Sequence, residues 1–169
     1  MKNKSELENL KEEILSSDFD AHPENIKKLF AKGIDLNARD DDGYPLFVSI
    51  MLFNGKYEVI KALLDNHANV NCLMPDNITP FMFACVGNFS PDIIQLLIEY
   101  GADINAQDIT GNTALISVCD TGNIEIIKTL VKNGANKTLK NSKGKTAYDV
   151  ALHNGLFDKD KTLELLLRP

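Results

Sequence analysis

The chain repeats itself at a nearly constant interval. A glycine, or in one unit a histidine, precedes a short apolar segment at Gly33, His67, Gly101 and Gly134. Neighbouring members of this series lie 34, 34 and 33 residues apart. A threonine followed by proline or alanine keeps the same step at Thr79, Thr113 and Thr146. A period of this length predicts an array in which each unit is one supersecondary element that buries its apolar face against its neighbours.

Each unit contains two helical patterns. Threonine can cap the free N–H groups that open the first helix, and proline at the first helical position lacks an N–H that would have no partner there. The second helix carries apolar residues on a wide face, as Glu58–Asn66 does. Glycine then accepts the left-handed backbone that ends the second helix. We expect His67 to tolerate the same backbone, because histidine is enriched among residues with positive φ.

The order of residues within a unit matches a known repeat. One unit reads Asp108-Ile109-Thr110-Gly111-Asn112-Thr113-Ala114-Leu115, then Gly122-Asn123-Ile124-Glu125-Ile126-Ile127. The unit before it ends in Leu97-Ile98-Glu99-Tyr100-Gly101-Ala102-Asp103-Ile104-Asn105. These segments resemble the ankyrin repeat, whose pattern is D-x-x-G-x-T-P-L-H-x-A, then G-x-x-E-I-V, then L-L-x-x-G-A-D-V-N.

One residue of the ankyrin pattern is missing throughout. The histidine that follows the T-P-L leucine is replaced by Phe47, Met82, Ile116 and Asp149. In the family that histidine links neighbouring turns by hydrogen bonds. We therefore expect this array to rely more on apolar packing.

The resemblance implies an all-α fold, a solenoid of about five stacked helix-turn-helix pairs with β-turn or hairpin-like connections. We expect a single ankyrin-repeat domain over residues 1–169, with units at about 1–39, 40–73, 74–107, 108–140 and 141–169. The first unit opens with a capping box, Ser5 and Glu8, and its polar outer face suits an end repeat.

Leucines dominate the helix expected at the C-terminal end, over about Asp160–Arg168. Their spacing predicts that Leu163, Leu166 and Leu167 are buried against the preceding repeat. Leu165 is then expected on the open end. One exposed leucine cannot supply the area of a lasting interface, so we expect a monomer.

Composition and charge exclude several functions. The net charge of −6 opposes binding to the phosphate backbone, so we expect no nucleic-acid partner. No apolar run approaches the length of a membrane span, and Met1 to Glu13 lacks the apolar core of a secretory signal. We therefore expect no membrane partner and a cytoplasmic location.

No arrangement of residues predicts catalysis, a cofactor or a metal. His22, His67 and His153 lie in different units, away from any ligand or nucleophile pattern. The acidic run 40–42 lacks the alternate spacing and distal glutamate of a calcium loop. The three cysteines are expected to be reduced core residues. We therefore expect no catalytic residue, no cofactor and no metal.

The resemblance implies a partner surface instead. In ankyrin arrays the turn tips and the exposed side of the first helices line a concave groove where partner proteins dock. The residues expected to bind an unidentified partner protein are Asp41, Asp42, Tyr44, Met51, Phe53, Asp76, Ile78, Phe89, Ile109, Asn112, Asp120, Lys143 and Lys145. The large apolar residues of the lengthened loops suit an interface, but Phe53 and Phe89 can also fold back onto their helix pair.

Charge along the tips is also polarised, from Asp40 at one end to Lys143 and Lys145 at the other, which could orient a partner. Two rival functions remain open. An enzyme or enzyme regulator would need a deep pocket or buried polar cluster between repeats, and we expect neither. A regulatory or assembly subunit would instead dock through the ends of the array.

Overall fold

The computed structural model describes residues 35–40, 43–53 and 55–168, except the side chain of Phe53. The predictions for residues 1–34 of the first repeat, and for Asp41, Asp42 and Phe53 as partner residues, therefore lie outside what it describes. The chain divides into two compact units, Met1–Pro75 and Asp76–Pro169, and each is considered by itself.

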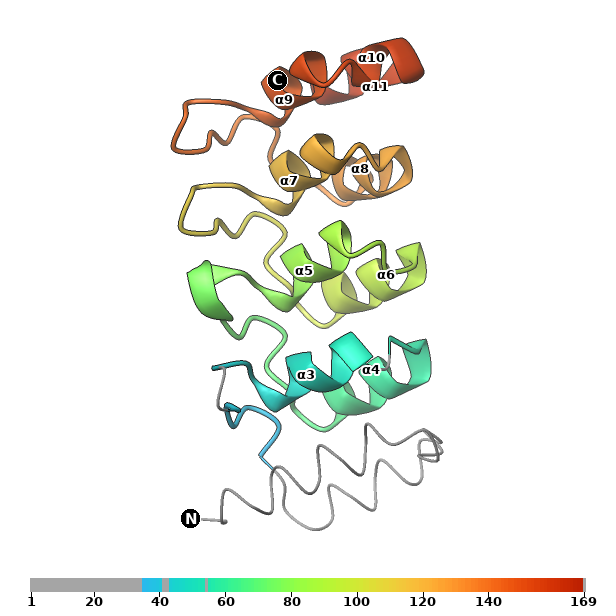
Figure 1. The fold of residues 1–169 in the computed structure, drawn as a ribbon. Coiled ribbons are helices and arrows are strands. Elements are labelled where there is room, and N and C mark those ends of the chain that lie inside the picture. The colour runs from blue at the N-terminus through green and yellow to red at the C-terminus, as the bar shows by residue number, and fades with distance from the viewer. Residues whose placement is uncertain (1–34, 41–42, 54, 169) are drawn as a thin grey trace. The chain divides into compact units, whose positions relative to one another are not determined.

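In the described residues the regular secondary structure is helical, apart from one isolated bridge between Arg39 and Pro45, which confirms the expected all-α fold. The first unit contains α3 (Leu46–Phe53) and α4 (Tyr57–Asp65). In the second unit, after the 3₁₀ turn η1 (Pro75–Asn77), two antiparallel helix pairs precede a last repeat with three helices (Figure 1). These helices are α5 (Pro80–Val86), α6 (Pro91–Glu99), α7 (Ala114–Thr121), α8 (Ile124–Lys132), α9 (Ala147–His153), α10 (Leu156–Lys159) and α11 (Thr162–Leu167).

Buried threonines start the first helix of each pair in the second unit, as predicted. The hydroxyl oxygens of Thr79 and Thr113 each accept the N–H three residues on, at 3.2 Å. Thr146 forms a full capping box with Asp149. These bonds satisfy N–H groups that the helix itself leaves without partners, which is why a threonine recurs at this place.

The second helices end as the glycine period predicts. Gly101 and Gly134 have φ of 84° and 85°, and His67 adopts φ of 67° in the equivalent place. The next residue donates its N–H to the carbonyl five residues back, as Ala102 does to Leu97 at 2.9 Å. This bond belongs to the left-handed cap that closes a helix. The tolerance of His67 is therefore confirmed.

In the second unit, the first helix of each repeat carries small, buried side chains. Ala84, Cys85, Ala114, Cys119 and Ala151 are fully buried where α5, α7 and α9 pack side by side. Burial raises the pKa of the Cys85 and Cys119 thiols to about 12, so both remain protonated at neutral pH. All three cysteines are free and buried, which confirms their expected place in the core.

Hydrogen bonds tie neighbouring turn tips together in the second unit. The N–H of Ile109 donates to the Asp76 carbonyl at 3.0 Å, and that of Ser142 to the Thr110 carbonyl at 2.8 Å. The Gln107 side chain bridges its own tip and the carbonyl of Lys140, which lies 33 residues away. Backbone groups and an amide thus link these turns in the absence of the family's histidine, and the greater reliance on apolar packing stays a prediction.

The last repeat differs in part from the sequence prediction. In place of one helix from Asp160, the short α10 precedes α11, and Asp160 accepts the N–H of Thr162 at 2.9 Å. Asp160 also pairs with Lys128 at 2.5 Å, and hydrogen bonds from Lys128 and Thr162 lower its pKa to about 2. Leu163 and Leu167 are buried and Leu165 is 73% exposed, as predicted. Leu166 is only half-buried.

Candidate partner-binding surface

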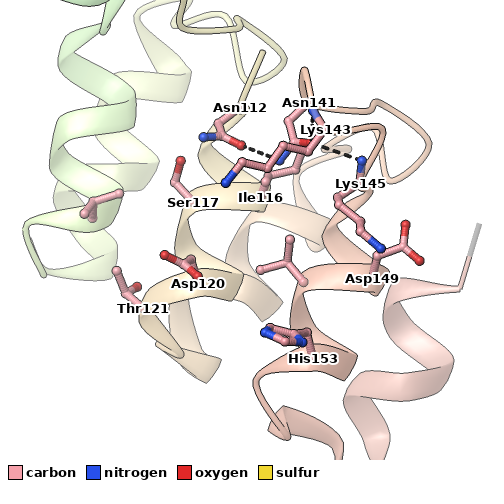
Figure 2. A pocket seen from close by; sticks show the side chains of 12 residues that line it. Asn112, Ile116, Ser117, Asp120, Thr121, Asn141, Lys143, Lys145, Asp149 and His153 are labelled. Carbon is pink, nitrogen blue, oxygen red and sulfur yellow. Dashed lines mark hydrogen bonds between the residues drawn. The ribbon is translucent and has the colours of Figure 1, made fainter. Parts of the chain in front are cut away.

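A hollow of about 720 Å³ lies on the second unit, with α7 on one side and α9 on the other (Figure 2). Four of the residues predicted for the partner surface line it together, Asn112, Asp120, Lys143 and Lys145. Of all its lining residues, only Ile116 is buried. The hollow is thus an open depression with a polar rim.

The turn that follows the fourth repeat's second helix forms one edge of the hollow. The Asn141 amide donates to Asn112 Oδ1 at 2.9 Å, which ties this turn to the one before it. Asn141 Oδ1 accepts the backbone N–H groups of Lys143 and Lys145, both at 3.0 Å. The Asn141 side chain thus holds the backbone of Lys143 and Lys145 in place.

The two carboxylates of the hollow, Asp149 and Asp120, have different hydrogen-bond partners. Asp149 accepts the backbone N–H and the hydroxyl of Thr146, at 2.9 and 2.8 Å. These bonds, the backbone one first, lower its pKa, and the charges of Lys145 and Lys140 add to the effect. Among the residues that the structure describes, the Asp120 carboxylate accepts a hydrogen bond from the Asn154 amide, at 3.2 Å, and Asp120 is exposed. Asp149 therefore serves the helix cap, whereas Asp120 is available at the surface.

Other predicted residues lie on the same unit but outside the hollow. Ile109 is 62% exposed at a turn tip, and Asp76 is exposed in η1 with φ of 61°. Ile78 is half-buried. Phe89 is also half-buried, with its ring centroid 6.3 Å from that of Phe83 in an edge-to-face arrangement. Phe89 has therefore folded back onto its own helix pair while keeping part of its ring exposed.

The prediction that Met51 contributes to the partner surface is wrong. It assumed a loop after the first helix, but α3 continues to Phe53. Met51 lies within α3 and is 0% exposed, as part of the core of the first unit. The neighbouring Leu52 is exposed instead. Tyr44 in the same unit is half-buried, and its N–H donates to Asp40 Oδ1 at 2.8 Å.

Sequence reasoning missed several residues of the hollow. Ser117 lies on α7, one turn before Asp120 and Thr121. On α9, Asp149 and Val150 lie one turn before His153. Residues three and four apart share a helix face. Counting from the capping residues Thr113 and Thr146 would have found both sets.

In the part of the chain that the structure describes, no group of three or more His, Cys, Asp or Glu side chains could hold a metal ion. None of the helices in that part is both long enough and apolar enough to cross a membrane.

Comparison with known proteins identifies the repeat. The family described as ankyrin repeats (3 copies) matches residues 14–108 and 88–169. The chain is 40% identical over 115 residues to the rat ankyrin repeat and SAM domain-containing protein 6, covering 67% of this chain and 13% of the relative. It is 31% identical over 126 residues to the mouse B-cell lymphoma 3 protein homolog, covering 74% of this chain and 28% of the relative.

A third relative, the human ankyrin repeat and KH domain-containing protein 1, is 33% identical over 101 residues, which is 59% of this chain and 4% of that protein. The chain therefore spans only a small part of the length of these relatives. The family match extends over residues 14–169, and the helix pairs and caps of the described residues agree with it. The chain belongs to the ankyrin-repeat family.

Proposed function

We propose that this chain is a non-catalytic module that binds a partner protein through the hollow between α7 and α9. Ankyrin repeats are generally protein–protein interaction modules. The observation that carries the proposal is that four residues predicted for the partner surface, from two different turns and one helix, line the same open hollow. An exposed polar rim around a small apolar floor is the usual arrangement of a protein interface.

The buried polar groups support a binding role over a catalytic one. Thr79, Thr113 and Thr146 each cap a helix, and the Ser49 hydroxyl donates to Asp40 at 2.9 Å. Each of these four groups has a structural partner. A catalytic site would instead bring a nucleophile and a base into reach of one another inside a cleft.

Filling the hollow tests the proposal. Peptides selected from a random display library on the wild-type protein serve as the probe. Ser117→Tyr places a ring in the hollow, and we expect the selected peptides to lose at least about tenfold in affinity, the effect of losing a central contact. Fluorescence anisotropy measures the change.

Gln95→Tyr is the matched control, because Gln95 lies on α6 and does not line the hollow. Its affinity for the same peptides is expected to stay within about twofold of wild type. Circular dichroism checks that both variants are folded. If Ser117→Tyr binds the selected peptides like wild type, the hollow is the wrong site, whatever the result for Gln95→Tyr.

A second candidate function is assembly through the array ends. It is favoured by two exposed leucines of the last repeat, Leu152 and Leu165. Scattered exposed leucines are common on soluble proteins, and a lasting interface needs about 1,000 Å². We therefore expect light scattering to give the monomer mass for wild type and for Leu165→Glu alike. A dimer that Leu165→Glu dissociates would favour the assembly function.

A further inference from the structure

The turn beside the hollow is strongly basic although the chain is acidic. Residues 137–145 contain four lysines and no aspartate or glutamate, whereas the whole chain has a net charge of −6. The four lysines are Lys137, Lys140, Lys143 and Lys145. A local excess of one charge on a surface of the other sign attracts ligands selectively to that place.

Lys143 and Lys145 direct this charge to the hollow. Both line it and both are exposed. Figure 2 shows both side chains along the edge formed by their turn. Within the described part of the chain, no salt bridge involves either ammonium group. The nearby Asp149 carboxylate is already held by Thr146. The Lys143 ammonium is therefore available to a ligand in the hollow, together with Lys145, whose charge also acts on Asp149.

Apolar groups lie beside the lysines. Ile116, which is 3% exposed, presents its remaining surface to the hollow, and Val150 and the exposed Val86 also line it. The Asp120 carboxylate and Thr121 lie toward the other end of α7, away from the lysines (Figure 2). The hollow thus offers a cationic edge and a small apolar floor within one ligand's reach.

We propose that the occupant of the hollow is an acidic segment of a partner protein, in which an aspartate or glutamate lies next to an apolar side chain. This inference rests on the proposed function. The carboxylate pairs with Lys143 and Lys145, and the neighbouring apolar side chain covers Ile116 and Val150. A polypeptide carries both chemistries in adjacent residues. A nucleic acid would be repelled by the chain's overall charge.

The display peptides provide the first measurement. Sequences selected on the wild-type protein are expected to be enriched in aspartate or glutamate next to an apolar residue. One selected peptide is then titrated against the double variant Lys143→Glu/Lys145→Glu. Reversing two rim charges is expected to weaken binding about tenfold at 0.1 M salt, and less at higher salt.

A matched control separates local pairing from net charge. Lys159→Glu/Lys161→Glu changes the same number of charges at the same spacing, on exposed residues that do not line the hollow. Its affinity for the peptide is expected to stay within about twofold of wild type. A peptide with lysine in place of its acidic residue is expected to regain affinity for the Lys143→Glu/Lys145→Glu variant.

The outcomes are distinguishable. Peptides blocked by Ser117→Tyr but lacking acidic residues would overturn this inference and leave the proposed function standing. Equal weakening by both double variants would also overturn it, because only net charge would then matter. A single-stranded oligonucleotide that binds more tightly than the peptides, and loses affinity in Lys143→Glu/Lys145→Glu, would assign the lysines to a phosphate ligand. Peptides unaffected by Ser117→Tyr would overturn both proposals.

Discussion

Replacing Ile127 by alanine is expected to lower the free energy of unfolding by about 2–5 kcal/mol. Ile127 lies in α8 and is 0% exposed. Its helix packs against α7 within its own repeat and against α6 and α11 of the neighbouring repeats. The shorter side chain loses transfer free energy and leaves a cavity that the rigid helices cannot fill. Urea denaturation followed by circular dichroism at 222 nm measures the change.

Ile109→Ala is the matched control for this experiment. It removes the same atoms from a side chain that is 62% exposed at a turn tip. We expect a change within about 0.5 kcal/mol, as for most surface substitutions. Similar losses for the two variants, or a wild-type stability for Ile127→Ala, would contradict the assigned core.

The features that follow from local chemistry were predictable from sequence. In the second unit a left-handed glycine follows α6 and α8, and a threonine oxygen caps α5, α7 and α9, whatever partner the chain binds. Gly101, Gly134 and His67 therefore lie where their period places them, and Thr113 caps where its period places it. The helix bounds follow from these positions to within a few residues.

Exposure of individual side chains was less predictable, because equivalent positions of different repeats differ in exposure. Met51 lies inside α3 and is buried. Val86 and Asp120, which follow Phe81 and Leu115 at the same spacing as Met51 follows Leu46, are exposed. Phe89 shows the same limit, since its contact with Phe83 depends on the path of a loop.

The hollow itself needed three-dimensional information. The turn carrying Lys143 and the α7 residue Asp120 are separated in sequence by a complete second helix. Their common position arises because α7 and α9 pack side by side and Asn141 bonds to Asn112. The repeat period predicts that equivalent residues stack. It does not predict which side chains leave a space between them.

Replacing Gly111 by alanine is expected to lower the free energy of unfolding by about 2–4 kcal/mol, from backbone strain together with a lost hydrogen bond. Gly111 has φ of 76°, a left-handed conformation that a β-carbon disfavours. A Cβ here would also lie 3.1 Å from Asn141 Cα and from the Ser142 nitrogen. These are backbone atoms of the next turn, so the turn must shift and strain the 2.8 Å bond from Ser142 N–H to the Thr110 carbonyl.

Gly144→Ala separates the two causes. Gly144 occupies the same place in the following turn, with φ of 71°, but no atom lies within 4 Å of its added Cβ. Only the backbone strain remains there, so we expect a loss of about 1–2 kcal/mol. Denaturation of the two variants side by side measures the difference, which reports the contact between neighbouring turns. Equal losses would mean that Gly111 is required only for its backbone conformation and that the turns do not pack closely.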